Sequence, residues 1–300
     1  MTKVSATSET RTGIAYSLGA FVVWGFMPSA FGFVADVPLL ETLAQRTIWS
    51  FTFLTAVVIV FGRLGRLKAA LRSRRVMLIL LCTTIMLLAT WVIFVHAINT
   101  QRMLHVSLGY YINPLFSVLL GVGFLREKLT RWQVLALVIA SVGVINQSLT
   151  LGELPWISLA LAVLFGVYGL VRKIVRVEAI EGLWVETGLL LPIAAAYIGY
   201  LVYNDNLSFG AGGFGTTEMM LMFLGVFTAL PLMWFTEGAR RLKLTILGIM
   251  QYIAPTLHFI LAVYAWDETF TTTHLITFAC IWFAVAIYLV QPLLAARKQA

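Results

Sequence analysis

The 300-residue chain is 60% hydrophobic and only 11% charged, and its mean hydropathy is +0.92. Soluble domains carry roughly 25% charged residues, so a water-soluble fold is excluded. The net charge of +8 would suit a nucleic-acid partner, but the basic residues concentrate in the links between apolar runs, where they report membrane topology instead.

Ten apolar runs are each long enough to cross a bilayer core about 30 Å thick as a helix. Continuous runs of this kind also exclude the alternating strands of a membrane β-barrel. We therefore predict an all-α integral membrane protein with ten transmembrane helices. The runs lie near residues 13–33, 39–61, 76–98, 103–125, 130–149, 155–174, 182–203, 217–238, 244–266 and 272–294.

Basic residues alternate between the links. Clusters at 63–75, 126–131 and 240–243 fall on one side of a ten-helix protein, whereas Arg102 stands in a link on the other side. Positive residues stay in the cytoplasm during insertion, so both termini are expected there, with the protein in the bacterial inner membrane. The first apolar run is too long for a signal-peptide core and is predicted to remain as a helix.

The second half of the chain repeats the first. Tyr111, Ile112 and Pro114 recur as Tyr252, Ile253 and Pro255, and Glu127 recurs as Glu268, all at one constant spacing. This predicts a five-helix repeat at 13–149 and a second repeat at 155–295. Because five is an odd number, the second copy is inverted in the membrane. Inverted repeats are typical of secondary transporters with a substrate site between the halves.

Two of the apolar runs contain both prolines and polar side chains. A proline frees a backbone carbonyl, which a membrane helix tolerates only where protein or water satisfies it. Pro114 and Pro255 therefore indicate helices that face a wet central cavity, with a purely structural kink as the alternative. The candidates for lining that cavity are Trp24, Arg46, His96, Asn99, Tyr110, Tyr111, Asn113, Pro114, Tyr168, Glu186, Gln251, Tyr252, Pro255 and His258.

Ionisable side chains within spans are costly and usually point inward. We expect Arg46 to attract an anionic or polar substrate group, and Glu186 to bind a proton or a substrate amine as the coupling residue. His96 and Asn99 would form a gate at one mouth. The aromatic candidates suit ring-bearing or amphipathic substrates. For each of these residues, ordinary structural bonding or packing is the alternative.

Several blocks of the sequence resemble a known family. "FVVWGFMP", "ETLAQRTIWSF", "SLGYYINPL", "YGLVRK", "LGIMQYIAPTL" and "FACIWFAVAIY" are similar to the RarD branch of the EamA family, in the drug/metabolite transporter superfamily. The resemblance covers residues 13–295 and implies a permease or exporter of small metabolites or drugs. Proteins of this branch are commonly labelled chloramphenicol-resistance permeases. The family also includes amino-acid exporters, so the substrate stays open.

Other classes of protein are disfavoured. The chain has no HExxH, DDxxD-like or GxSxG pattern, so we expect neither an enzyme nor a bound metal or cofactor. A GxxxxGK[ST] nucleotide-binding loop is also missing, which argues against direct use of ATP. A channel would need an ion filter built by oligomerisation or by loops, and the sequence shows neither feature. The expected partners are lipid, a small-molecule substrate and a coupling proton.

Overall fold

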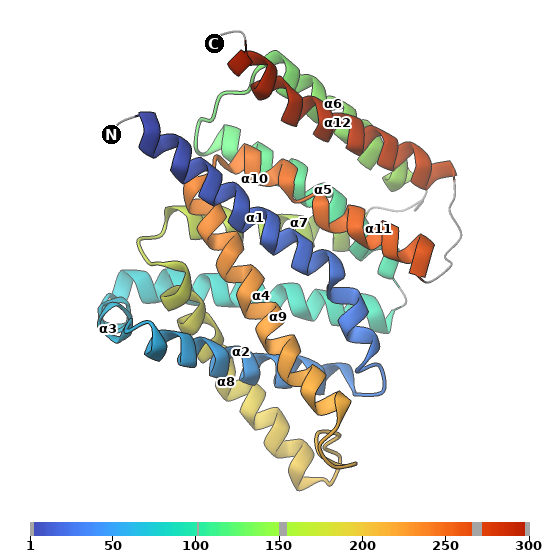
Figure 1. Cartoon of the computed structure of the whole chain (residues 1–300). Coiled ribbons are helices and arrows are strands. Elements are labelled where there is room, and N and C mark those ends of the chain that lie inside the picture. The colour runs from blue at the N-terminus through green and yellow to red at the C-terminus, as the bar shows by residue number, and fades with distance from the viewer. Residues whose placement is uncertain (1–2, 101, 150–154, 266–271, 298–300) are drawn as a thin grey trace. The chain divides into compact units, whose positions relative to one another are not determined.

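Helices account for the fold. The computed structural model describes residues 3–100, 102–149, 155–265 and 272–297, and within these ranges there are twelve α-helices and no strand (Figure 1). Glu268, the repeat partner of Glu127, lies outside the described residues. The helices are α1 (Lys3–Gly32), α2 (Leu39–Val60), α3 (Leu64–Arg72), α4 (Arg74–Asn99), α5 (Met103–Gly123), α6 (Arg131–Leu149), α7 (Trp156–Ile174), α8 (Ala179–Tyr203), α9 (Thr216–Arg241), α10 (Leu244–Met250), α11 (Ile253–Ala265) and α12 (Thr272–Arg297).

The predicted apolar runs coincide with these helices. Within the described residues, nine helical segments are long and apolar enough to cross a membrane. The tenth run forms α12, whose described apolar part, Leu275–Ile287, is shorter. The ninth run forms two helices, because α10 ends at Met250 and α11 begins at Ile253. Hydropathy therefore located the spans, but it did not reveal how the ninth is divided.

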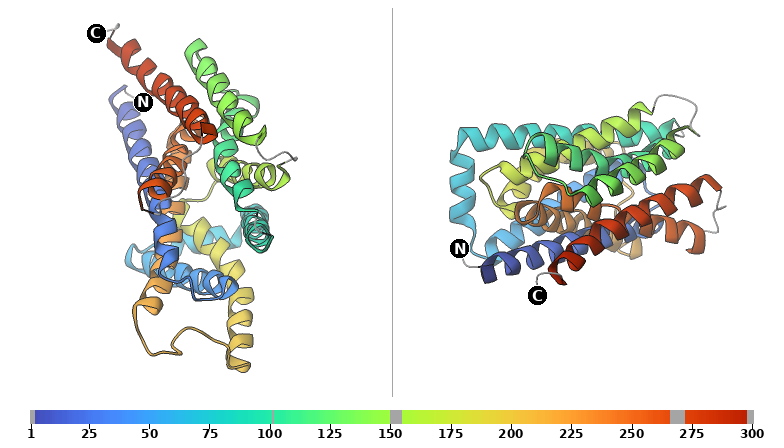
Figure 2. Two further views of the ribbon diagram at one scale, coloured as in Figure 1. Left: turned by 90° about the vertical axis from the view of Figure 1, so that its right-hand side faces the viewer. Right: turned by 90° about the horizontal axis from the view of Figure 1, so that it is seen from above.

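The basic link at 63–75 contains a helix that the hydropathy pattern does not predict. The nine residues of α3 are amphipathic, with Leu67 and Ala70 buried and Lys68 exposed. The helix stands across the ends of α2 and α4, most clearly in the right-hand view of Figure 2. Its two buried positions are three residues apart, which places them on one helical face.

The chain divides into two compact units, each containing segments from both sequence halves. Unit 1 comprises the described residues of Met1–Arg11, Ala89–Leu170 and Arg241–Ala300, and unit 2 comprises Thr12–Leu88 and Val171–Arg240. The predicted repeats are defined by sequence similarity, whereas the two units are defined by packing, so the units do not test the repeats. The two predicted five-helix repeats therefore stay a prediction.

In unit 1, helices at equivalent positions of the two predicted repeats pack side by side in opposite directions. Asn146 of α6 bonds Thr273 and Thr277 of α12, while Gly143, earlier in α6, meets Cys280, later in α12. The same reversal holds for α5 and the α10–α11 pair. The antiparallel packing of these helices is compatible with the predicted inverted repeat.

In unit 2, α2 and α8 form a third antiparallel pair of helices that occupy equivalent positions in the predicted repeats. Trp184 donates to Thr55 Oγ1 over 2.9 Å, and its ring lies 4.9 Å from that of Phe51. Phe51 also contacts the position of Gly188, one turn further along α8. Helix α9 closes on α2 at Gly225, where an added Cβ would lie 2.5 Å from the Cβ of Trp49.

The Gly-rich link between α8 and α9 is held by two carboxylates. Glu41 of α2 accepts hydrogen bonds from the backbone of Ser208 and Phe209, at 2.9–3.1 Å. Glu218, in the first turn of α9, accepts from the backbone of Gly210 and Gly215 at 3.0 and 2.7 Å. Charge-assisted bonds of this kind are strong, so the link has a defined course despite its glycines.

Candidate functional site

The break between α10 and α11 brings most of the predicted site residues together in unit 1. Proline has no N–H, so Pro255 deprives the carbonyl of Gln251 of its usual helical donor. Gln251 and Tyr252 form a turn between the two helices. Pro114, its repeat equivalent, lies within a continuous α5. Only one of the two symmetry-related prolines therefore accompanies a break.

A chain of buried amides crosses from α5 to this break. Asn113 Nδ2 donates to Gln251 Oε1 over 2.7 Å, and Gln251 Nε2 donates to Ser117 Oγ over 3.1 Å. All three side chains are buried. The Oδ1 atom of Asn113 has no hydrogen-bond partner among the described residues. A buried acceptor without a donor costs about 1–3 kcal/mol, so this oxygen is suited to a donor from a bound molecule.

Glycine allows the two helices to approach at this level. A Cβ at Gly248 would lie 2.8 Å from the carbonyl oxygen of Pro114. Any side chain at this position would push α10 away from α5 and stretch the amide contacts. The Asn113–Gln251 bond therefore depends on a glycine one turn before the break.

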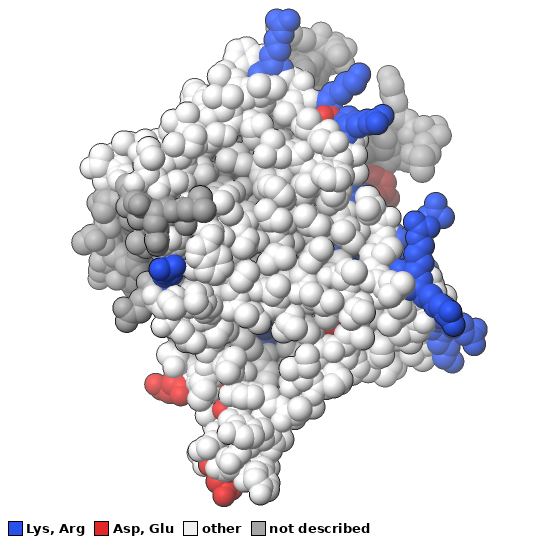
Figure 3. Space-filling model, turned by 180° about the vertical axis from the view of Figure 1, so that it is seen from behind, with Lys and Arg blue, Asp and Glu red and all other residues white. Residues whose placement is uncertain are grey.

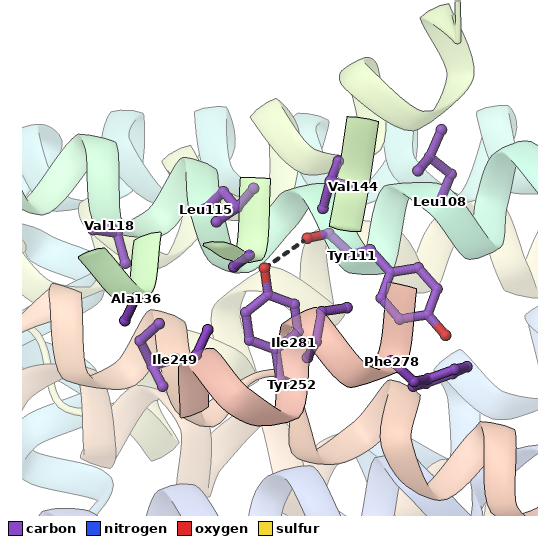
Figure 4. Close-up of a cluster of buried hydrophobic side chains, with 12 residues drawn as sticks. Leu108, Tyr111, Leu115, Val118, Ala136, Val144, Ile249, Tyr252, Phe278 and Ile281 are labelled. Atoms are coloured by element: carbon purple, nitrogen blue, oxygen red, sulfur yellow. Dashed lines mark hydrogen bonds between the residues drawn. The ribbon is translucent and has the colours of Figure 1, made fainter. Parts of the chain in front are cut away.

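The two repeat-related tyrosines pack into the core of unit 1. Tyr252 is 1% exposed and donates from Oη to the backbone carbonyl of Tyr111 over 3.2 Å. The ring of Tyr111 turns the other way and meets the edge of Phe278 at a centroid distance of 5.6 Å (Figure 4). Both tyrosines lie in one apolar cluster with Leu115 and Ile281. Within unit 1 they act as packing residues that join α5, α11 and α12.

Tyr110 and His258 lie together near the break. Their rings meet edge to face at a centroid distance of 5.9 Å. Tyr110 is 46% exposed and His258 is half-buried. This aromatic pair offers an accessible apolar surface on unit 1, which also contains the unsatisfied Oδ1 acceptor of Asn113.

The charged candidates lie in unit 2. Arg46 is 4% exposed in α2 and Glu186 is fully buried in α8. Glu186 Oε1 accepts a hydrogen bond from Thr83 over 2.6 Å and lies 3.8 Å from Nη1 of Arg172. Arg172 is itself fully buried and donates to the carbonyl of Ala179 over 3.2 Å. Glu186 therefore has a buried cationic partner.

Sequence reasoning missed Arg172 in this role. The residue lies beside Lys173 in the last turn of α7, where basic side chains are typical of a cytoplasmic helix end. Gly182, one turn before Glu186, was the available signal. A Cβ at Gly182 would lie 2.0 Å from Arg172 Nη1, so only glycine leaves room for the guanidinium.

The remaining candidates are not drawn into either cluster by a described contact. Trp24 is half-buried against Phe21 and Phe235, with centroid distances of 5.9 and 5.7 Å. Tyr168 is fully buried beside Phe165. His96 and Asn99 are exposed at the end of α4, and the His96 ring lies 5.8 Å from that of Trp156. Their predicted roles in the cavity or its gate stay predictions.

Comparison with known proteins places this arrangement in a family. Residues 11–147 match the EamA-like transporter family. Protein RarD of Salmonella typhi is 40% identical over 97% of this chain and 99% of its own length. The chain is a RarD-type member of the EamA family. It is therefore a multi-pass membrane protein of the drug/metabolite transporter superfamily.

Other relatives of this RarD-type protein carry similar descriptions. The uncharacterized transporter YojE of Bacillus subtilis is 39% identical, over 94% of each chain. A "Chloramphenicol-sensitive protein RarD" of Pseudomonas aeruginosa is 30% identical, over 96% of this chain and 97% of its own. A crystal structure of another protein, 20% identical, matches with a TM-score of 0.70 over 93% of this chain and 96% of that chain. At that identity the likeness concerns the fold alone.

Among the described residues, no group of three or more His, Cys, Asp or Glu side chains is placed to hold a metal ion. The groups available for chemistry are hydrogen-bonding amides, an aromatic pair and a buried ion pair. Amides and aromatic rings of this kind can form hydrogen bonds and ring contacts with a small molecule.

Proposed function

We propose that this RarD-type protein is a secondary-active transporter that moves small organic solutes by alternating access. The Oδ1 acceptor of Asn113, which is buried beside a helix break and lacks a hydrogen-bond partner among the described residues, carries the proposal. Broken helices with polar side chains at mid-span are typical of substrate sites in transporters built from inverted repeats. The three antiparallel pairs of repeat-equivalent helices also support it.

The chemistry of the site selects a class of substrate. A solute that donates a hydrogen bond to Asn113 would satisfy the unpartnered Oδ1 atom. If the solute also carries an apolar ring, that ring would stack near Tyr110 and His258. Aromatic side chains with polar tips favour such amphipathic molecules. Aromatic amino acids, nucleosides and amphenicols all present a donor next to a ring. One relative's name refers to chloramphenicol, so amphenicols belong in the test.

Ligand-dependent thermal stabilisation of the purified protein tests the site. A bound ligand raises the unfolding temperature by mass action. We expect at least one solute from a panel of amino acids, nucleosides and amphenicols to stabilise the wild type but not Asn113→Leu. Ser117→Ala is the matched control, because it cuts the same amide chain but keeps the Asn113 acceptor.

A stabilising solute must also cross the membrane. We expect proteoliposomes containing the wild type to exchange that solute in a counterflow assay. Equal stabilisation of Asn113→Leu would place the site elsewhere. Failure of every stabilising solute to exchange would overturn transport itself.

We further propose Glu186 as the coupling group. Protonation would neutralise its carboxylate and weaken its attraction to Arg172, and thereby loosen the contact between the ends of α7 and α8. Counterflow by Glu186→Gln should lose its dependence on pH, whereas Glu181→Gln, a buried acid one turn earlier in α8, should retain it. Unchanged pH dependence in Glu186→Gln would remove this residue from the mechanism.

The proposed location is the bacterial inner membrane, with both termini in the cytoplasm. The charges of unit 2 support this orientation. Basic side chains gather at its α3 end, and acidic side chains appear at the other end, near the α8–α9 link (Figure 3). Positive-inside insertion would place the end that carries the basic side chains in the cytoplasm.

A further inference from the structure

Unit 2 contains a large open groove that is lined by none of the residues proposed for substrate binding or coupling. Its volume is about 1220 Å³, which exceeds the roughly 300–1,000 Å³ of an ordinary small-molecule pocket. It is bounded by α3, the first turns of α4, the last turns of α7 and the link that leads to α8. Every residue that lines it belongs to unit 2.

One end of the groove is cationic. Arg66, Arg75 and Arg176 line it. Two acids also line the groove: Glu178 is bonded by Arg66 at 2.8 Å and by Arg63 at 2.6 Å, and Glu181 pairs with Arg63 at 3.3 Å. Within the described part of the chain, neither Arg75 nor Arg176 is paired with a carboxylate. The exposed guanidinium groups of Arg75 and Arg176 therefore give the groove positive charge that no carboxylate of the described residues balances.

The other end of the groove is apolar and open. Leu78 of α4 and Ile174 of α7 line it, and they are 63% and 60% exposed. Cys82 continues the same wall. It follows Arg75 by two turns of α4, so the wall extends about 10 Å along the helix from the arginine.

We propose that this groove binds an anionic phospholipid. Arg75 and Arg176 would hold the phosphate, since a guanidinium fork matches phosphate oxygens and basic pockets beside membrane helices favour anionic headgroups. An acyl chain would lie along Leu78, Cys82 and Ile174. A zwitterionic lipid leaves the excess positive charge unbalanced, and a free phosphate leaves the apolar wall uncovered. None of the residues proposed for substrate binding or coupling lines the groove, so this inference does not rest on the proposed function.

Native mass spectrometry of the delipidated, full-length protein tests the headgroup contact. We expect phosphatidylglycerol to remain bound several-fold more than phosphatidylcholine. The double variant Arg75→Gln, Arg176→Gln should lose that preference. Arg72→Gln, Arg74→Gln is the matched control, because it removes the same charge from neighbouring exposed positions that do not line the groove, and it should keep the preference.

A second variant tests the apolar wall. Cys82→Phe leaves all the arginines in place and fills the groove, so it should reduce retained phosphatidylglycerol several-fold. Soluble glycerol phosphate, added in the same assay, should compete weakly, because it lacks the acyl chain. The proposal is overturned if the two double variants behave alike, if Cys82→Phe binds as the wild type does, or if glycerol phosphate displaces the lipid efficiently.

Discussion

At the scale of single residues, buried charges need specific space. Arg172 and Glu186 are both fully buried and 3.8 Å apart. Taking two charges out of water is costly, and breaking such a pair is more costly still because it leaves one charge unbalanced. Gly182 provides the space for this pair, because the guanidinium of Arg172 occupies the volume that a side chain at position 182 would take.

Gly182→Ala should therefore destabilise the protein by about 3 kcal/mol or more, the usual cost of breaking a buried pair. Gly199→Ala is the control in the same helix: nothing lies within 4 Å of its added Cβ, so it should be neutral or slightly stabilising. Denaturant unfolding of both variants in detergent measures the difference. Equal stability of the two variants would refute the space-filling role of Gly182.

A second residue-scale effect concerns pH. Partial burial alone would raise the pKa of Glu178, but the hydrogen bond from Arg63 and the charges of Arg66 and Arg240 outweigh it and hold this pKa below its usual range. A carboxyl whose folded pKa is lowered stabilises the fold above its unfolded pKa of about 4.3, and loses that contribution as the pH falls through the folded pKa.

Wild type and Glu178→Gln should therefore differ most in melting temperature near neutral pH. The difference should shrink as the pH falls below about 4, where the wild-type carboxyl becomes protonated. Thermal unfolding across this range measures it. A difference that persists unchanged at low pH would show that packing, and not charge, stabilises this contact.

At the scale of elements, one helix is capped by a distant loop. Glu127, in the link after α5, accepts hydrogen bonds from the backbone of Leu244 and Thr245 at 2.7 and 2.9 Å. These donors begin α10 and have no helical partners of their own. The repeated Glu127 thus has a structural use in holding the first half of the broken ninth span.

Glu127→Ala should cost about 1–2 kcal/mol, the usual loss for a helix cap. Lys128→Ala, the exposed neighbour, should change stability by less than about 0.5 kcal/mol. Hydrogen exchange of the amides of 244–250 gives a local measurement, and it should speed up in the first variant only. Unchanged exchange in Glu127→Ala would contradict the capping role.

At the scale of the whole molecule, charge sets orientation. Single cysteines at Asp36→Cys and Lys68→Cys, in a Cys82→Ser, Cys280→Ser background, lie at opposite ends of unit 2. A membrane-impermeant maleimide applied to intact inner-membrane spheroplasts should label the first cysteine and not the second. Labelling of Lys68→Cys would reverse the proposed orientation and place the termini outside.

The sequence alone determined the membrane class, the positions of the apolar helices and the resemblance to the RarD branch, while the five-helix repeat stays a prediction. These depend on hydrophobicity and local residue order, because each helix satisfies its own backbone bonds in lipid. Hydropathy could not find α3, whose apolar face is too short to form a run, nor show which of the two prolines would accompany a break.

Tertiary structure decided which polar groups meet. Asn113 and Gln251 were both candidates, but their bond depends on Gly248 letting α10 approach α5. Arg172 became the partner of Glu186 only once α7 and α8 were folded together. Side-chain pairing depends on close packing between segments far apart in the chain, whereas partition into lipid depends on each segment by itself. That physical difference separates what was predictable from what was not.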